Sequence, residues 1–460
     1  MIYSSTRGSD INLKFGDVLL NGLAKDGGLY VPNSIKSYSE DELDSLRELD
    51  YSSLAFELTK HFVLGEISVN EYKKICTNSY KKSFGEEIIS FDKLDQHKYI
   101  ANLFNGPTYA FKDFALQLLG NIYDYILRKR KIKLTILGAT SGDTGSAAIH
   151  GCAKSNNVKI FILFPLNKVS EIQRKQMTTV KKKNVFNIAV KGNFDDCQRM
   201  VKNYFKFNNE NRKINLAAVN SINWVRIMGQ IVYYFWSYFR VSRKFDPMSF
   251  VVPSGNFGNA YAGYISKKMG LPIKKIIIGS NKNDILTRFF KTGKMKIKKT
   301  LTSLSPSMDI QVSSNFERLL FHFYENGKMI EKLFYKLENT KEFSVAESHL
   351  KNMRKTFGYG RLSDFETKKT ISQIFDRHKL IVDPHTAVGL SVGDKQLDKK
   401  ERRIYLATAH YSKFIKTVKE SVKKKVDYPN KLKKILKKEE KFEIIENDIY
   451  QLDKLIVKQN

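Results

Sequence analysis

The spacing of hydrophobic residues along the chain changes near residue 90. Before that point apolar residues recur every three or four positions, as in residues 41–49 and 54–63, and this spacing predicts amphipathic helices. After it, short apolar runs alternate with stretches of helical spacing, which predicts strands followed by helices. The sequence therefore predicts an α-rich N-terminal region followed by an α/β fold.

Three strand–loop–helix units are predicted in the second part of the chain. The apolar runs 134–137, 250–252 and 404–407 each lead into a polar turn and then into a helical pattern. Parallel strands need such crossovers, so we expect mostly parallel sheets covered by helices. Ligands of this architecture bind at the carboxyl ends of the strands, where all three turns begin.

The order of these patterns divides the chain into four consecutive regions. Residues 1–90 form the α-rich region, and residues 91–245 and 246–425 form two α/β regions. Residues 426–460 are rich in lysine, with helical periodicity, and we expect a basic, solvated C-terminal element. A chain of 460 residues that is 42% apolar is long enough for two or three domains with a sizeable core.

The charge is strongly positive, with 79 Lys and Arg against 47 Asp and Glu, a formal net charge of +32. The basic residues are scattered, and no zinc finger, basic zipper or RRM signature accompanies them, so no nucleic-acid partner is predicted. No apolar run approaches the roughly 18 residues of a membrane span. The three cysteines are too few for a disulfide framework or a thiolate metal site, so we expect no metal and a cytoplasmic protein.

One lysine stands between two phenylalanines at the start of a predicted helix. In GPTYAFKDFAL, residues 106–116, Lys112 follows Phe111 and precedes Asp113 and Phe114. Burial favours the neutral, nucleophilic amine of a lysine, whereas a carboxylate directed at it would favour the charged form. We therefore expect Asp113 to face away from the amine and to cap the helix. Taken alone, Lys112 is equally compatible with an exposed helix position.

Two polar loops at predicted helix starts are candidate anion sites. In PSGNFGN, residues 253–259, two glycines before a helix allow backbone N–H groups to turn inward around a phosphate. In TSGDTG, residues 140–145, hydroxyls and a carboxylate precede another helix. Each loop alone also fits a glycine turn or a helix cap, and neither is a Walker or dinucleotide motif. Together with a nucleophilic lysine they indicate a cofactor carrying an aldehyde and a phosphate, as pyridoxal phosphate (PLP) does.

Seven motifs occur in the order and approximate spacing of the threonine synthases of the longer bacterial and fungal form. They are GPTYAFKDF, TSGDTG, SINWVR, VPSGNFGN, SPSMDI, SNFER and TAHYSKF. The chain resembles that family from SSTRG and DGGLYVP near its start to the C-terminal helix. The resemblance implies PLP fold type II, the tryptophan synthase β-like fold. It also implies a carbon–oxygen lyase that converts O-phospho-L-homoserine and water to L-threonine and phosphate, the last step of threonine biosynthesis.

The resemblance also implies roles for individual residues. Lys112 would bind the cofactor through a Schiff base and move the substrate's Cα proton, and Thr408 would face the pyridine nitrogen. Asp143 would lie near the ring hydroxyl, where shorter relatives carry asparagine. The cofactor phosphate would be held by Gly255, Asn256, Phe257, Gly258 and Asn259. The substrate carboxylate would be bound by Thr140, Ser141 and Thr144, and the substrate phosphate by Asn223 and Arg226.

The sequence leaves some alternatives open. Tyr411 and Ser412 stand where many family members have proline and alanine, and we interpret His410 and His385 as hydrogen-bonding supports, not as catalytic groups. A serine or threonine dehydratase or a cysteine synthase of the same fold is the nearer alternative function. A basic RNA-associated protein that has lost its activity is the more distant one. The sequence does not decide between a monomer and a homodimer.

Overall fold

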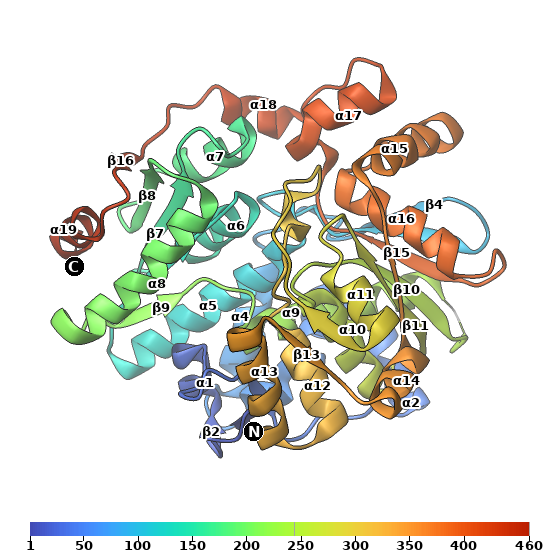
Figure 1. Ribbon diagram of the computed structural model, residues 1–460, viewed down its shortest axis with the longest axis horizontal. Helices are drawn as coiled ribbons and strands as arrows, with labels where there is room; N and C mark the ends of the chain where they lie inside the picture. The colour runs from blue at the N-terminus through green and yellow to red at the C-terminus, as the bar shows by residue number, and fades with distance from the viewer. Residues whose placement is uncertain (243, 460) are drawn as a thin grey trace. The chain divides into compact units, whose positions relative to one another are not determined.

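The computed structural model describes residues 1–242 and 244–459, which form two compact units (Figure 1). Unit 1 contains Met1–Asn105 and Ser221–Val426, and unit 2 contains Gly106–Asn220 and Asp427–Asn460. Each unit is therefore assembled from two separate stretches of chain. The predicted four-region division describes order along the sequence and stays a prediction.

Unit 2 is built on a five-stranded sheet in the order β16-β8-β7-β6-β9. All of its strand pairs are parallel, as expected from the repeated strand–loop–helix pattern. The run VKIFILFP is almost entirely buried in β7, which is typical of parallel strands with both faces covered. The strands are β6 (Leu134–Ala139), β7 (Val158–Pro165), β8 (Val185–Val190), β9 (Leu216–Ala218) and β16 (Glu443–Ile445).

Helices of unit 2 place two of the candidate site elements. Helix α5 begins at Lys112 itself, and α6 begins at Asp143, directly after β6 and the TSGDTG loop. Both starts confirm the predicted helix positions. The helices are α5 (Lys112–Arg130), α6 (Asp143–Cys152), α7 (Glu171–Thr178), α8 (Phe194–Asn211), α18 (Asn430–Leu436) and α19 (Ile449–Gln459).

Most residues of the C-terminal element are exposed, and a few buried ones dock it on unit 2. Its strand β16 pairs with β8 at the edge of the sheet, and α19 packs on α8 (Figure 1). Leu452 and Ile456, one helical turn apart, are fully buried in the core of unit 2. Two apolar residues at this spacing are enough to dock one face of α19, while its lysines stay in solvent.

Unit 1 contains a six-stranded sheet in the order β14-β11-β10-β15-β5-β4. Its strands are parallel except for β4, which pairs antiparallel with β5. In β14 the sequence Gly358-Tyr359-Gly360 is explained by packing, because a Cβ at position 360 would lie 2.7 Å from a methyl of Val392. The strands are β4 (Ser90–Lys93), β5 (Lys98–Asn102), β10 (Met248–Pro253), β11 (Ile273–Ser280), β14 (Phe357–Arg361) and β15 (Arg403–Ala407).

Helix α9 (Trp224–Val241) is the central helix of unit 1. Nearly all of its residues are buried, including the polar Arg226 and Gln230, and it contacts α3 and α10. The N-terminal region is α-rich as predicted, with an additional three-stranded sheet, β2-β1-β3. The remaining strands are β1 (Ile2–Ser5), β2 (Leu13–Lys14), β3 (Tyr30–Pro32), β12 (Lys294–Lys296) and β13 (Glu342–Ser344). The other helices are α1 (Phe15–Asn21), α2 (Glu40–Arg47), α3 (Tyr51–Thr59), η1 (Lys60–Val63), α4 (Val69–Tyr80), α10 (Gly258–Lys268), α11 (Ile285–Thr292), η2 (Pro306–Met308), α12 (Phe316–Tyr324), α13 (Gly327–Thr340), α14 (Glu347–Thr356), α15 (Asp364–His378), α16 (Pro384–Gln396), η3 (Tyr411–Phe414) and α17 (Ile415–Val422).

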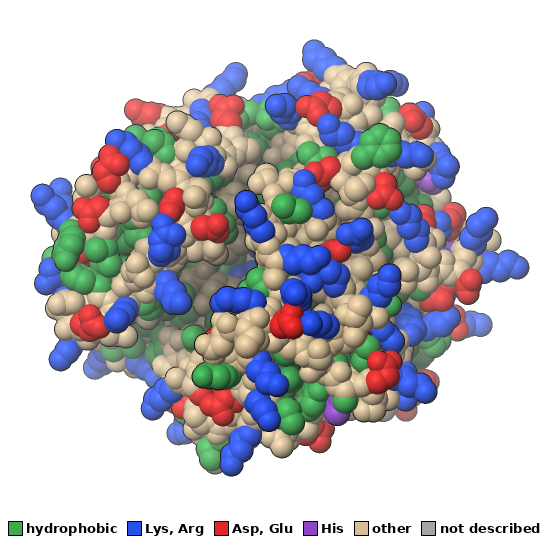
Figure 2. All heavy atoms as spheres, in the orientation of Figure 1, with side chains coloured by type: hydrophobic (Ala, Val, Ile, Leu, Met, Phe, Trp, Pro, Cys, Tyr) green, Lys and Arg blue, Asp and Glu red, His purple; other side chains and the backbone are tan. Residues whose placement is uncertain are grey.

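Charged side chains are dispersed over the face of the molecule seen in Figure 2. Figure 2 shows lysine and arginine side chains over the whole visible face, with acidic side chains between them. This distribution agrees with a solvated basic surface and not with a single basic stripe. Among the described residues, none of the helices combines the length and the apolar composition needed to cross a membrane.

Candidate active site

Lys112 is buried at the first position of α5. Its side chain is 10% exposed, and its Nζ lies 3.6 Å from Asp143 Oδ2 and 5.8 Å from the centre of the Phe111 ring. The predicted burial of this lysine is therefore confirmed. Its ion pair with Asp143 brings together two of the candidate residues, and both belong to unit 2.

Asp113 stabilises the turn before α5 through two hydrogen bonds. Its Oδ2 accepts a hydrogen bond of 2.8 Å from the Thr108 backbone N–H, and its Oδ1 accepts one of 2.8 Å from the Thr108 hydroxyl. Gly106 is required here, since a Cβ at that position would lie 2.5 Å from Asp113 Oδ2. Asp113 thus stabilises the turn that precedes Lys112. The expectation that it caps α5 was wrong, because the structure describes no side-chain cap of this helix.

The TSGDTG loop is held by the hydroxyl of Thr140. This oxygen accepts hydrogen bonds from the N–H groups of Gly142, at 3.0 Å, and Gly145, at 2.9 Å. Thr140 is buried, Thr144 is half-buried and Ser141 is exposed. Thr140 therefore shapes the loop, while Ser141 and Thr144 offer hydroxyls at its surface.

Asp143 has a second partner that sequence reasoning missed. Gln173, near the start of α7, donates from Nε2 to Asp143 Oδ1 at 2.8 Å, and both side chains are buried. Gly142, with a φ of +136°, lies against Gln173, because a Cβ there would be 2.7 Å from the Gln173 Cδ. Gln173 therefore orients the carboxylate that faces Lys112. In the sequence, the only indication of a special role for Gln173 is its position three residues after Ser170, which caps α7.

The loop after β10 forms a tight cradle in unit 1. Phe257 has a φ of +67°, and its buried ring packs on Phe316 with the ring centres 5.1 Å apart. The Asn256 side chain accepts a 3.1 Å hydrogen bond from the Gly258 N–H. At position 255 only glycine fits without displacement, because a Cβ would lie 3.1 Å from the Met308 Cα. The SPSMDI segment, which contains Met308, therefore closes one side of this loop.

The SNFER motif, residues 314–318, and the serine before it fix the carbonyl groups of the same loop. The Ser313 hydroxyl donates to the Gly255 carbonyl at 2.7 Å, and the Asn315 N–H donates to the Asn256 carbonyl at 3.1 Å. Asn315 Nδ2 adds a longer bond of 3.3 Å to the Asn256 carbonyl. Carbonyl and N–H groups of a peptide point in opposite directions. Holding the carbonyls toward residues 313–315 thus turns the neighbouring N–H groups the other way.

Thr408 follows β15, the strand next to β10 in the sheet of unit 1. Because adjacent parallel strands end at the same edge, the 254–259 loop and Thr408 leave the same edge of this sheet. His410 lies half-buried beyond Thr408, its Nδ1 2.7 Å from the Ser412 hydroxyl. Burial lowers the pKa of His410 to about 4, so its ring is neutral near pH 7. The Ser412 hydroxyl thus supports this turn.

Asn223 and Arg226 lie at the start of α9. Asn223 caps this helix by accepting a 3.1 Å bond from the Val225 N–H, and its Nδ2 donates to the Leu19 carbonyl at 3.0 Å. Arg226 is fully buried, and burial lowers the pKa of its guanidinium to about 10. Asn223 thus has a structural role, and Arg226 is a buried cation in unit 1.

His385 is bonded within its own helix start. Its Nδ1 lies 2.6 Å from Asp383 Oδ2, and Asp383 caps α16. This arrangement agrees with a supporting histidine.

The residues described here fit PLP. Lys112 supplies a buried amine, and the 254–259 loop supplies a cradle at a helix start that a Cβ at position 255 would crowd. The buried Asn259 Nδ2 has no hydrogen-bond partner among the residues the structure describes. A buried N–H donor without a partner can be satisfied by an anionic ligand such as a phosphate.

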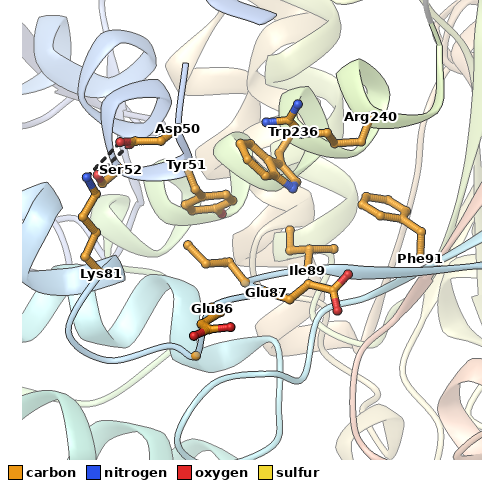
Figure 3. A pocket seen from close by; sticks show the side chains of 12 residues that line it. Asp50, Tyr51, Ser52, Lys81, Glu86, Glu87, Ile89, Phe91, Trp236 and Arg240 are labelled. Atoms are coloured by element: carbon orange, nitrogen blue, oxygen red, sulfur yellow. Dashed lines mark hydrogen bonds and ion pairs between the residues drawn. The ribbon is translucent and has the colours of Figure 1, made fainter. Parts of the chain in front are cut away.

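A separate cavity of unit 1 contains none of these residues. It has a volume of about 610 Å³ and is lined by side chains of α3, α9 and residues 81–91 (Figure 3). Three of its charged groups are engaged locally: Lys81 pairs with Asp50 at 2.9 Å, and the Arg240 guanidinium lies 4.1 Å above the Trp236 ring. We assign the cavity no part in the site.

Three family models match the chain in succession. They describe the threonine synthase N terminus, over residues 2–80, a pyridoxal-phosphate dependent enzyme, over residues 94–407, and the threonine synthase C-terminal region, over residues 386–456. The middle match alone covers more than half of the 460 residues. It contains all of the candidate site residues except Thr408, which follows its end directly.

More distant structures share the fold alone. A threonine deaminase from Solanum lycopersicum has a TM-score of 0.51 at 13% identity, covering 85% of this chain and 97% of its own. At 13% identity this structural similarity shows a shared fold, and it does not favour a dehydratase function for the chain.

Much closer relatives span the full length. The threonine synthase of Pseudomonas aeruginosa is 43% identical over 99% of this chain and 98% of its own, and that of Saccharomyces cerevisiae is 38% identical over 100% and 98%. A PLP-bound threonine synthase from Brucella melitensis has a TM-score of 0.97 at 38% identity, covering 100% of this chain and 99% of its own. The chain belongs to the threonine synthase family of pyridoxal-phosphate-dependent enzymes.

Proposed function

We propose that the chain converts O-phospho-L-homoserine and water to L-threonine and inorganic phosphate, the reaction of the family to which it belongs. The observation that carries this proposal is the buried amine of Lys112 at a helix start, 3.6 Å from a carboxylate that Gln173 orients. Burial favours the neutral amine that covalent attachment and proton transfer require, whereas the carboxylate of Asp143 favours the charged form.

When bound, PLP supplies an aldehyde that links covalently to amines and a ring that delocalises negative charge from the neighbouring carbon. Lys112 Nζ is the amine that would hold it covalently, and Asp143 would lie by its ring hydroxyl. The Thr408 hydroxyl would face the pyridine nitrogen. The phosphate would be bound by Gly255, Asn256, Phe257, Gly258 and Asn259.

Lys112 also moves protons in this proposal. Its Nζ would take the proton from the substrate Cα and return a proton later in the reaction. The turn braced by Asp113 and the ion pair with Asp143 limit the motion of this side chain. A base held in one place contributes more to catalysis than one that must be ordered first.

The remaining groups bind and orient the substrate. The exposed hydroxyl of Ser141 and the half-buried one of Thr144 would receive its carboxylate, next to the buried Thr140. Asn223 and Arg226 are the candidates near its phosphate. In the net reaction the Cγ–O bond to phosphate and one Cβ–H bond break, and a hydroxyl from water adds at Cβ. The two protons released, from Cβ and from water, go to Cγ and to the departing phosphate. A buried guanidinium such as Arg226 would stabilise the departing phosphate.

We also propose that the protein works in the cytoplasm. All three cysteines, Cys76, Cys152 and Cys197, are free thiols and buried, which is the usual state in a reducing compartment.

The proposed function is tested by incubating the purified protein, loaded with PLP, with phosphohomoserine. Equal amounts of phosphate and threonine are expected. After borohydride reduction, the cofactor should be found on the peptide that contains Lys112. A Lys112→Ala variant should lose the reaction and the adduct, whereas Lys129→Ala, on the exposed end of the same helix, should retain both.

Other outcomes would contradict the proposal. Phosphate release without threonine would contradict the proposed reaction. Conversion of serine or threonine to an oxoacid as the faster reaction would assign the chain to a dehydratase. A Lys112→Ala variant as active as its parent would remove the central role of this amine.

A further inference from the structure

Two adjacent tyrosines of α9 bind the last residue of the phosphate loop. Tyr233 donates its hydroxyl to Asn259 Oδ1 at 2.7 Å. The Tyr234 hydroxyl lies 3.0 Å from the same Oδ1 and 2.8 Å from the Asn259 backbone carbonyl. Three polar contacts from one helix thus converge on a single asparagine.

These contacts determine which way the Asn259 amide points. Because its Oδ1 accepts from the two hydroxyls, its Nδ2 is directed away from them. Asn259 is 4% exposed, and this Nδ2 is buried without a hydrogen-bond partner among the described residues. Buried amide donors are nearly always paired, so an unpaired one at a phosphate loop indicates a ligand that completes it.

The rings of both tyrosines are closely packed between α9 and α10. Tyr233 and Tyr234 are both fully buried, and their rings stack with centres 5.3 Å apart. Gly263, one turn after Asn259 on α10, is needed to admit Tyr234, because a Cβ there would lie 2.8 Å from the Tyr234 ring. The contact between α9 and α10 is therefore shaped to bring both hydroxyls to Asn259.

We propose that Tyr233 and Tyr234 are positioning residues for the cofactor phosphate. They hold the Asn259 amide so that its Nδ2 serves as a phosphate donor, and they act on the cofactor only through Asn259. This inference rests on the proposed function, because it requires that the 254–259 loop binds PLP. Helix α9, which begins in the SINWVR motif, would thus have a second role, because it would position the cofactor phosphate as well as carry Arg226. Arg226 precedes Tyr233 by seven residues, or two turns, so both lie on one face of α9.

The test uses the PLP-loaded enzyme and its Tyr233→Phe and Tyr234→Phe variants. Two properties are measured: the ³¹P resonance of the bound cofactor phosphate, and the rate at which PLP is lost on dialysis against a trap for the free aldehyde. We expect a shifted resonance in each variant. The loss of PLP should accelerate about tenfold for one missing hydroxyl and about a hundredfold for both, the order expected for buried hydrogen bonds.

Tyr238→Phe is the matched control. Tyr238 is fully buried on the same helix, but its hydroxyl lies 3.1 Å from the Lys244 carbonyl and 3.0 Å from the Asp246 carbonyl, away from the loop. This variant should lower the melting temperature without moving the phosphate resonance. In an Asn259→Ala background, Tyr233→Phe should add no further loss of PLP, since the two residues act as one unit.

The outcomes separate this inference from the function on which it rests. A parent enzyme that neither holds PLP nor forms threonine overturns the proposed function, and this inference with it. A parent that does both, with Tyr233→Phe and Tyr234→Phe variants that match it in ³¹P resonance and in PLP loss, overturns only the positioning role. An equal shift in the Tyr238→Phe variant also overturns it, because general packing of α9 would then be the cause.

Discussion

Replacing Gly255 with alanine tests whether the 254–259 loop holds the cofactor phosphate. The added Cβ would lie 3.0 Å from Ile310 Cδ1, 3.1 Å from the Met308 Cα and 3.3 Å from the Ser307 carbonyl oxygen. Two of these three neighbours are backbone atoms, which cannot swing aside as the end of a side chain can. Either the loop or the SPSMDI segment must therefore shift by a few tenths of an ångström.

The structure suggests that this variant folds but binds PLP more weakly. Inserting one methyl group into a dense site costs about 1–3 kcal/mol. Replacing glycine with alanine at an ordinary backbone conformation returns about 0.4–1 kcal/mol, because the unfolded chain is restricted. Position 255 is not among the glycines with positive φ, so no backbone strain is added. Since the displacement falls on the loop itself, we expect the dissociation constant for PLP to rise about tenfold, the ratio for 1.4 kcal/mol.

The assay is a titration of the apoenzyme with PLP, followed by the visible absorbance of the bound cofactor. Gly85→Ala is the matched control, because a Cβ at that position meets no atom within 4 Å. The control should bind PLP as the parent does. If the Gly255→Ala variant also bound PLP with the affinity of its parent, the loop would not be the phosphate site.

Three further predictions concern stability. Burial lowers the pKa of His61 to about 4 from its ordinary 6.5, so the unfolded chain binds more protons between these values. The free energy of unfolding therefore contains the full contribution of neutral His61 above pH 6.5 and loses it as the pH falls toward 4. The loss is roughly 1 kcal/mol at pH 5.5. Urea unfolding at several pH values should show a smaller pH dependence of this free energy in His61→Leu than in the parent. Glu317 binds Arg7 through both oxygens, at 3.0 and 3.1 Å, so Glu317→Gln should reduce the unfolding free energy by about 3–5 kcal/mol. A urea midpoint equal to that of the parent would contradict this value. A Cβ at Gly151 would overlap the Leu116 carbonyl of α5, so Gly151→Ala should lower the melting temperature and change the absorbance of bound PLP, whereas Gly85→Ala should do neither.

The parts of the fold that could be predicted are those with a local signal. The start of α5 at Lys112 was evident because apolar residues recur at helical spacing from Phe111 onward. The glycine loops were evident because each lies between an apolar run and a helical pattern. The burial of Lys112 followed from the apolar residues on both sides of it.

Contacts between distant segments could not be predicted in this way. Gln173 lies 30 residues from Asp143, and Asn315 lies 59 residues from Asn256. A single hydrogen-bonding side chain at such a separation leaves no periodic pattern in the sequence. The docking of the C-terminal element was not predicted for a related reason, because the i, i+4 pair Leu452 and Ile456 lies among many lysines.

The pairing of β16 with β8 has a consequence for biosynthesis. The sheet of unit 2 lacks its last strand until residues 443–445 have left the ribosome, and α19 follows even later. Throughout translation the growing chain must therefore carry β8 with an open hydrogen-bonding edge and α8 with an uncovered apolar side. We expect that a stop codon placed shortly before residue 443 yields a product that aggregates or is degraded, although it retains every residue assigned to catalysis.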